Sequence, residues 1–509
     1  MKYLSIIAFL LFILSGCGKG EEKLSGGELY NMHCARCHIA PDISHLPKEF
    51  WTGKILPEMA ARMGIKDGQF KPYDKMGFDE MEIIHRSGIY PYKPIMNERD
   101  WAVLKNYILD RAPDSLPGSW SEQTTLQQTR FTARRLDFDD NPGSFFTFLK
   151  YVPQENKFWT GDISGQVMEY KFEDGSPVLK HKVDHAVVDY VEKDTVSYIT
   201  DIGILNPSEL STGKIVAAYG DQYLTIPDTL HRPVNNLVVD LNGDGVEEMV
   251  VSEFGHLTGQ LSLLWIDQQG HYEKKTLLNQ PGTIRSMARD MDKDGKLDII
   301  ALTAQGDESI TILYQQDDLV FRAEKVLRFS PIYGSSWFEL LDFDHDGDDD
   351  IITVNGDNAD KTNIPKPYHG LRIHLNDGNN NFTESYFYPL NGATRFVADD
   401  FDQDEDVDFM IISTFPDYKN KPDQALIYLE NQDEKSFQFQ PYTFEQANLS
   451  RWFLLDAGDV DQDGDTDIIL SAFTYVFIPV PGEISKNWET NNVDLMVLEN
   501  NLIDSHKTK

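Results

Sequence analysis

A nine-residue acidic pattern, Asp-x-Asp-x-Asp-Gly-x-x-Asp, recurs five times in this chain and constrains its fold more than any other feature. Its copies open at Asp240, Asp290, Asp342, Asp400 and Asp459, so the steps between them are 50, 52, 58 and 59 residues. A period of this size is typical of propellers and repeat arrays, in which each repeat is one supersecondary unit. The pattern therefore predicts a repetitive fold over the second half of the chain.

Alternating acidic side chains on a tight loop bring oxygen atoms together, and oxygen ligands suit a hard cation such as calcium. The glycine at the sixth position allows the sharp turn. The loop is not an EF-hand, because the glutamate expected at position twelve is replaced by apolar residues or threonine. An apolar, β-branched run follows each ninth position instead, so we expect the loop to join two strands. Acidic hairpin turns without metal are the alternative, but so many carboxylates without a cation would repel one another.

The predicted calcium ligands are the alternate positions, one to nine, of each copy, for up to five calcium ions. They are Asp240, Asn242, Asp244, Val246 and Glu248; Asp290, Asp292, Asp294, Lys296 and Asp298; Asp342, Asp344, Asp346, Asp348 and Asp350; Asp400, Asp402, Asp404, Asp406 and Asp408; and Asp459, Asp461, Asp463, Asp465 and Asp467. The first and fourth copies are the weakest, since the first has Asn242 and Glu248 and the fourth has Glu405 in place of glycine.

These repeats resemble the FG-GAP or VCBS repeats of β-propellers. The resemblance covers residues 125–503 and implies an all-β propeller. Two segments, 158–170 and 200–221, resemble earlier blades that lack the acidic pattern. Two and five blades predict a seven-bladed propeller. A strand from the other end of the chain is the candidate for completing the last blade, although the pattern does not reveal its position.

A second motif, His33-Cys-Ala-Arg-Cys-His38, contains two of the three cysteines. A zinc site would need a second pair of ligands, and a thioredoxin-like dithiol would need a βαβ context; neither is visible. Cys-x-x-Cys-His is the attachment signature of a c-type haem, in which Cys34 and Cys37 bind the porphyrin and His38 binds the iron. A labile surface dithiol or disulfide is the alternative.

Residues 25–113 resemble a class I cytochrome c, which implies one covalent haem c in a small all-α domain. A helix leads into the Cys-x-x-Cys-His motif, and a second helix begins at Asn97 and ends before Pro113. Met96 precedes this second helix and is the predicted sixth iron ligand. Its competitors are Met59, Met63, Met76, Met81 and His85.

The third cysteine indicates the compartment. The chain opens with Lys2, an apolar run and Leu14-Ser15-Gly16-Cys17, which describes a secretory signal and resembles the bacterial lipobox. The resemblance implies lipidation at Cys17 and an extracytoplasmic, membrane-anchored protein, expected at the outer membrane. An ordinary secreted protein is the alternative. Residues 1–17 are then the signal, 18–24 a tether, 114–124 a linker and 504–509 a tail.

The formal net charge of −37 and the lack of a basic stripe argue against a nucleic-acid partner. The usual hydrolase and phosphate-loop motifs are missing. A regular set of residues, Arg285, Trp337 and Arg395, follows a repeated glycine, and Arg451 lies near the corresponding place. Such residues around a propeller axis could hold an anionic or sugar-like ligand, although packing between blades is the simpler interpretation.

The sequence thus favours electron transfer by a lipid-anchored monohaem cytochrome whose calcium-stabilised propeller docks a redox partner or a ligand. An oxidoreductase that acts on a sugar-like substrate at the propeller face is the first alternative. A surface adhesin or glycan-binding protein is the second.

Overall fold

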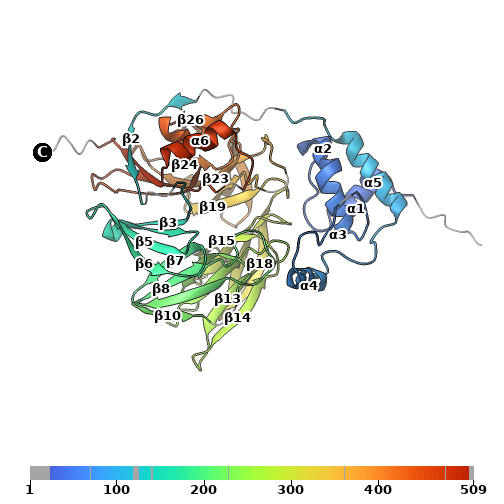
Figure 1. Cartoon of the computed structure of the whole chain (residues 1–509), viewed down its shortest axis with the longest axis horizontal. Helices are drawn as coiled ribbons and strands as arrows, with labels where there is room; N and C mark the ends of the chain where they lie inside the picture. Colours follow the sequence, from blue (N-terminus) through green and yellow to red (C-terminus); the bar gives the residue numbers. More distant parts are fainter. Residues whose placement is uncertain are drawn as a thin grey trace, which may run out of the picture.

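The computed structural model describes residues 23–68, 70–117, 125–138, 142–226, 229–359, 362–475 and 477–503. They form a small helical part and a larger all-β part, which lie side by side (Figure 1). The predicted lipidation site, Cys17, lies outside the described residues.

The helical part contains five α-helices, a π-helix over Trp51–Ile55 and a 3₁₀ turn over Ile43–His45. The α-helices are α1 (Gly26–His33), α2 (Lys48–Phe50), α3 (Leu56–Arg62), α4 (Phe78–Ser87) and α5 (Glu98–Arg111). Ser25 and Glu28 form a capping box at the start of α1, and the Asn97 side chain accepts a hydrogen bond from the Asp100 N–H at the start of α5. The two predicted helices are therefore confirmed, with side-chain caps where the sequence places them.

Helices α1 and α5 approach each other closely. A Cβ atom on Gly26 would lie 2.3 Å from the Cβ of Tyr107, so only glycine fits at this crossing. Leu29 of α1 and Leu104 and Ile108 of α5 are buried in one apolar cluster beside the crossing. The cluster fixes how the residues after α1 face those before α5.

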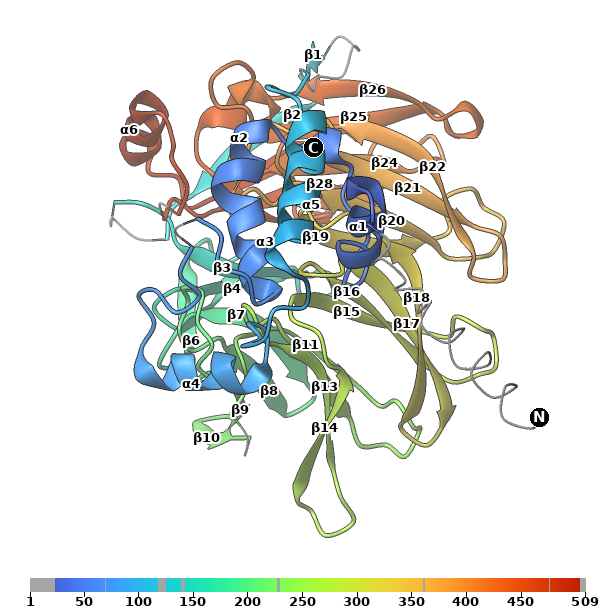
Figure 2. The same cartoon turned by 90° about the vertical axis from the view of Figure 1, so that its right-hand side faces the viewer.

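The all-β part consists of seven sheets, which form a seven-bladed β-propeller and confirm the predicted blade count (Figures 1 and 2). The two blades without acidic repeats are β3–β6 (Phe146–Val152, Lys157–Asp162, Gln166–Lys171, Pro177–Lys182) and β7–β10 (Val187–Lys193, Val196–Asp201, Lys214–Tyr219, Gln222–Thr225). The next three are β11–β14 (Pro233–Val239, Glu248–Glu253, Gln260–Ile266, Tyr272–Leu278), β15–β18 (Thr283–Arg289, Asp298–Thr303, Ser309–Asp317, Val320–Arg328) and β19–β22 (Ser335–Leu341, Asp350–Asn355, Gly370–Asn376, Phe382–Pro389). The sixth is β23–β26 (Ala393–Asp399, Asp408–Ser413, Leu426–Asp433, Gln438–Thr443), and the seventh includes β27–β29 (Trp452–Gly458, Asp467–Ala472, Leu495–Asn500). Helix α6 (Gly482–Asn491) lies between β28 and β29.

The seventh blade is completed by β2 (Phe131–Leu136), which precedes the first blade in the chain. It pairs antiparallel with β29, with Phe131 opposite Asn500 and Leu136 opposite Leu495. A short strand, β1 (Leu126–Gln127), also pairs in parallel with β26 of the sixth blade. The start of the propeller is thus joined to its last two blades, which closes the ring and leaves fewer strand edges unpaired.

The helical part packs on one face of the propeller, in front of it in Figure 2. The Ser208 hydroxyl donates to Glu80 over 2.7 Å, and the Tyr368 hydroxyl donates to the His45 carbonyl over 2.9 Å. Ile332 packs against the apolar cluster of the helical part. These propeller residues lie in connections from second to third strands or from one blade to the next, so they share the face where inner strands begin. The acidic loops end the inner strands and lie on the opposite face.

Among the described residues, none of the helices has both the length and the apolar character needed to cross a membrane.

Candidate functional site

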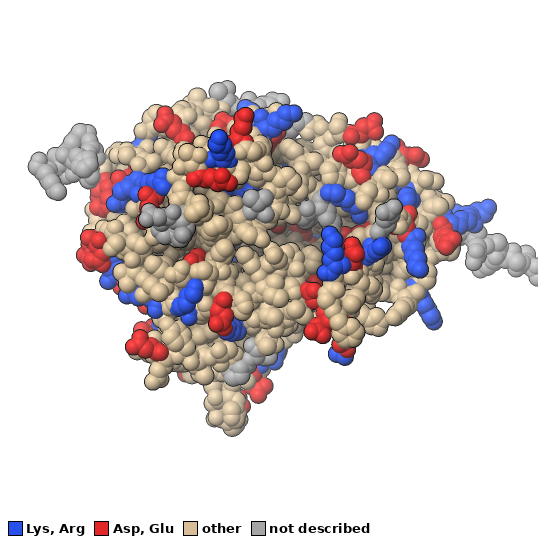
Figure 3. Space-filling model, in the orientation of Figure 1, with Lys and Arg blue, Asp and Glu red and all other residues tan. Residues whose placement is uncertain are grey.

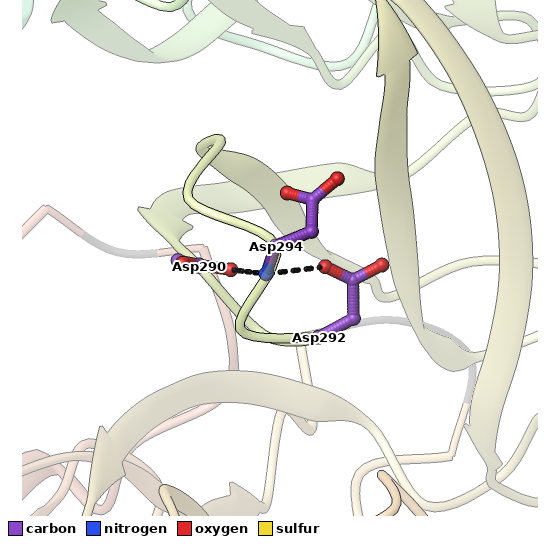
Figure 4. Close-up of side chains that lie close together, drawn as sticks. All are labelled: Asp290, Asp292 and Asp294. Atoms are coloured by element: carbon purple, nitrogen blue, oxygen red, sulfur yellow. Dashed lines mark hydrogen bonds between the residues drawn. The ribbon is translucent and has the colours of Figure 1, made fainter.

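The five acidic loops share one hydrogen-bonding pattern. In each, the first carboxylate accepts backbone N–H groups of the fifth and sixth residues, and the fifth side chain accepts the N–H of the seventh. In the second loop the Asp294 N–H lies 3.1 Å from Asp290 Oδ1 and 3.3 Å from Asp292 Oδ1 (Figure 4). The repeat therefore encodes a single loop shape in five blades.

This loop shape brings carboxylates together in the four later copies. Ligand oxygens lie within 4.8 Å of one another in four groups: Asp290, Asp292 and Asp294; Asp342, Asp344 and Asp350; Asp400, Asp402 and Asp404; and Asp459, Asp461 and Asp467. An all-oxygen set of this kind fits the donor chemistry of Ca²⁺. In the first copy the Asn242 side chain instead donates to Asp244 and Asp318, at 3.2 and 3.1 Å.

The ninth position of each loop is a buried carboxylate that opens the second strand. Asp298, for example, accepts the Met291 N–H at 2.9 Å and the Gln315 N–H at 2.8 Å, so it links the loop to the end of the third strand. The pKa of Asp350 is raised to about 6, that of Asp467 to about 7 and that of Asp408 to about 8, chiefly by burial and in smaller part by neighbouring acids. A cation beside these loops would favour their ionised forms.

The sixth position has a positive φ in every loop, between 76° at Glu405 and 100° at Gly464. Glycine adopts this conformation without strain, whereas an L side chain does not. The departure at Glu405 therefore leaves the loop shape intact and places the strain in the backbone.

In the helical part, the Cys-x-x-Cys-His motif lies at the end of α1. Cys34 is the C-cap of the helix and packs against the apolar cluster, and burial raises the pKa of its thiol to about 12. Cys37 is exposed, and His38 Nδ1 lies 2.8 Å from the Ile39 carbonyl. A hydrogen bond at Nδ1 leaves Nε2 available, which is the arrangement usual for a histidine that binds a metal.

Met96 is buried in the apolar cluster against which Cys34 packs. Met63 is buried there too, and the Ile95 N–H donates to the Met63 carbonyl over 3.0 Å, so the two segments are adjacent. His85 is exposed and bonds to the Tyr92 hydroxyl at 2.7 Å. Met63 is thus a competitor whose backbone is hydrogen-bonded to the residue before Met96.

The predicted axial residues Arg285, Trp337 and Arg395 come together on adjacent inner strands. The guanidinium carbons of Arg285 and Arg395 lie 3.7 and 4.0 Å from the centre of the Trp337 ring. Arg285 also donates to Glu339 over 2.8 Å, and the Trp337 indole N–H donates to the same carboxylate over 2.8 Å. Burial lowers the pKa of both arginines, and that of Arg395 falls to about 9 with a smaller contribution from Arg285.

Arg451 does not join this cluster, contrary to the expectation from sequence. It precedes β27, is buried, donates to the Tyr475 carbonyl over 2.9 Å and lies 5.0 Å from the Trp488 ring of α6. The equivalent residue is Leu454, which, like Arg395, lies five positions before the first aspartate of the loop. The same count identifies Asn235 in the third blade, which a pattern of arginine and tryptophan does not mark.

These features define a seven-bladed β-propeller with acidic loops on one face and a helical N-terminal part on the other. Residues 290–353 match the FG-GAP-like repeat family, which agrees with the predicted resemblance over that stretch. No curated protein matches the chain.

Several solved structures are similar to the chain at low identity. The N-terminal domain of Nup159 has 11% identity and a TM-score of 0.43, with 75% of this chain and 99% of that chain covered. The Neurospora crassa Pan2 WD40 domain has 12% identity and a TM-score of 0.43, with 74% of this chain and 97% of that chain covered. YCF48 bound to D1 peptide has 9% identity and a TM-score of 0.42, with 74% of this chain and 99% of that chain covered.

Proposed function

We propose that this protein is an electron carrier: an extracytoplasmic, lipid-anchored, monohaem c-type cytochrome whose propeller docks a partner. The observation that carries the proposal is the position of Cys34, Cys37 and His38 at the end of α1, with Met96 buried in the cluster that Cys34 contacts. When bound, the haem would supply one-electron redox chemistry, and a His/Met ligand pair would leave its iron without an open position.

The surface of the helical part supports a bound apolar group. Several large apolar side chains near the motif and near Met96 are exposed, notably Met32 at 53%, Tyr92 at 85% and Ile95 at 43%. Where such side chains form one contiguous patch, the patch commonly marks a binding site. A porphyrin between the motif and the Met96 segment would cover such area, and the thiols of Cys34 and Cys37 would anchor it.

The packing between the two parts supports docking through the propeller. The His45 ring stacks on Tyr368 at 4.7 Å, and Tyr368 stacks on Tyr333 at 5.1 Å. Aromatic rings are thus in contact from the helical part into the propeller, and the Ser208–Glu80 hydrogen bond adds a second attachment. The acidic face lies away from this contact, free to meet a redox partner protein.

The lipid anchor rests on the sequence around Cys17, and the outer membrane is its expected location. Cys17→Ser should release the protein from the membrane fraction into the soluble fraction, because the attached chains provide the membrane affinity. A variant that stays with the membrane would overturn the anchor.

The haem is tested by attachment. Replacing Cys34 and Cys37 together with serine should remove haem staining from a denaturing gel, because thioether bonds survive unfolding. His85→Ala is the matched control and should keep the stain, since His85 is exposed and bonded to Tyr92. Staining that persists in the double variant would overturn the assignment.

Calcium is tested by chelation. Removing calcium should lower the melting temperature of the propeller without removing the haem, because calcium would bind the folded loops and not the unfolded chain. Asp344→Asn should weaken this response, while Asp194→Asn, in a turn outside the repeats, should not. Stability unaffected by either chelator or added calcium would mean that the loops hold no metal.

A further inference from the structure

The propeller axis is surrounded by one residue from each blade. Each inner strand has a bulge near its start, and the residue after the bulge occupies the same register in every blade. In blade order these residues are Phe148, Asp189, Asn235, Arg285, Trp337, Arg395 and Leu454. We call this set the axial ring.

The acidic groups at the axial ring already have partners. Asp189 accepts the Asn235 side-chain amide at 3.0 Å and the Asn236 N–H at 2.7 Å. Glu339, two residues after Trp337, is occupied by Arg285 and by the Trp337 indole. Asp456, two residues after Leu454, accepts the Tyr151 N–H at 2.8 Å and the Ala457 N–H at 3.0 Å.

Arg395 is the exception. Its guanidinium stacks on Trp337, but among the described residues it has neither a carboxylate within ion-pair distance nor a hydrogen-bond acceptor. Its nearest basic neighbour, Arg285, uses its own carboxylate partner. The next residue around the ring, Leu454, is apolar and buried. The carboxylates of Glu339, Asp189 and Asp456 attract it only at longer range, beyond ion-pair distance. A partly buried guanidinium without a hydrogen-bonded carboxylate leaves its N–H donors for an anion.

The geometry around Trp337 also limits which class of ligand could bind at the axial ring. Sugars stack on the open face of an aromatic ring, but guanidinium groups cover both faces of Trp337. The ring therefore orients the two arginines and is not itself a platform for a sugar. A planar fork of donors matches a carboxylate or phosphate group.

We propose that Arg395 anchors an axial site for a small oxyanion, a carboxylate or phosphate group, on the propeller face that carries the helical part. Trp337 holds the guanidinium in place, and Glu339 fixes Trp337 through the indole N–H. The site uses no haem ligand and no acidic-loop residue, so it stands whether or not the proposed electron transfer does.

Titration calorimetry on the full-length protein tests the site, with malonate and inorganic phosphate as probes at ionic strength matched with chloride. No calcium is added, because both probes would bind it. We expect saturable binding of at least one probe. Arg395→Met should weaken it about tenfold or more, the effect of losing charge-assisted hydrogen bonds. Arg328→Met is the control, because Arg328 lies on an outer strand and pairs with Asp307; it should keep affinity within about twofold.

Arg395→Lys guards against misfolding, since it keeps the charge and removes the planar fork. It should bind the probe more weakly than the wild-type protein while unfolding at the same denaturant concentration. Three results would overturn the proposal: no saturable binding of either probe, wild-type affinity in a folded Arg395 variant, or equal losses in the Arg328 control. Preference for malonate would identify a carboxylate ligand, and preference for phosphate a phosphate-bearing one.

Discussion

Glu405→Gly should stabilise the propeller. Glu405 stands where the other four loops have glycine, and its φ of +76° lies in the left-handed region. Its side chain is exposed and forms no ion pair among the described residues. The substitution therefore removes backbone strain without removing a contact.

The size of the gain follows from two opposing effects. A left-handed residue other than glycine costs about 1–2 kcal/mol. Glycine has more freedom in the unfolded chain, which returns about 0.5–1 kcal/mol. The free energy of unfolding should thus rise by about 0.5–1 kcal/mol.

Urea denaturation followed by tryptophan fluorescence measures this change in metal-free and calcium-saturated buffer. Glu405→Gln separates backbone from charge, because it keeps the Cβ atom and should leave stability nearly unchanged. Gly347→Ala is the reverse change in the third loop: φ there is +91° and no heavy atom lies within 4 Å of the added Cβ, so it should lose about 1 kcal/mol through strain alone. If Glu405→Gln stabilises as much as Glu405→Gly, charge and not strain explains the gain, and the reasoning fails.

Three further predictions concern other parts of the molecule. Gly26→Ala should destabilise the helical part by about 1–3 kcal/mol in chemical denaturation, because the added methyl group would overlap the facing helix α5. Gly53→Ala is the control and should not destabilise it, since Gly53 has open space around it. Equal effects of the two changes would refute the tight crossing of α1 and α5. Met96→Ala should abolish the far-red thioether–iron absorption band and lower the reduction potential of the haem. Met63→Ala should leave the band and the potential unchanged and lose only about 2–5 kcal/mol of packing stability. The opposite result would assign the sixth ligand to Met63. Burial lowers the pKa of His374 to about 4. As pH falls below about 6.5, this histidine is protonated in the unfolded chain before it is protonated in the folded protein. The free energy of unfolding of the propeller should therefore fall by up to about 1.4 kcal/mol per pH unit between pH 6.5 and pH 4. His374→Gln should reduce this pH slope in urea denaturation, and an unchanged slope would show that the histidine does not cause it.

The acidic repeats could be predicted from sequence because one local pattern determines one loop. Alternating acids, glycine at the sixth position and a β-branched run define the turn and the strand after it, and this information is contained in about fifteen residues. The two blades without acids were also predicted, from the segments 158–170 and 200–221, which overlap β4–β5 and β8–β9. The calcium itself stays a prediction.

Closure of the propeller could not be located in the same way. Strand β2 pairs with β29 across more than 350 residues of sequence, and no turn signal links them. Its alternation resembles that of any other edge strand. Only the three-strand sequence of the last blade indicates that a partner is missing.

Only part of the axial ring was predicted from the sequence, because each inner strand contains a bulge that shifts its register. Counting back from the acidic loop gives the correct register, whereas searching for arginine and tryptophan led to Arg451. A bulge inserts one residue near the start of each inner strand, so residues close to it change face with a shift of one position. Asn235 and Leu454 share the register but not the chemistry, and Arg451 has the chemistry but not the register.

The distribution of charge offers a last test of docking through the propeller. Residues 25–113 contain twelve basic and twelve acidic side chains, so the excess negative charge lies outside the helical part. On the face in Figure 3 acidic and basic side chains are interspersed, without a continuous basic stripe. A cationic redox partner would therefore be attracted to the propeller and not to the part that holds the proposed haem.

If the partner docks there, the rate of haem reduction by a cationic donor should fall as ionic strength rises, because salt screens the attraction over about 8–10 Å. Two exposed acids at turns between third and fourth strands, Asp317 and Asp377, lie on the same face and are not predicted calcium ligands. Asp317→Asn with Asp377→Asn should flatten that dependence more than the same change at Asp79 and Asp110 of the helical part. Equal effects from the two pairs, or a rate independent of salt, would place the docking site elsewhere.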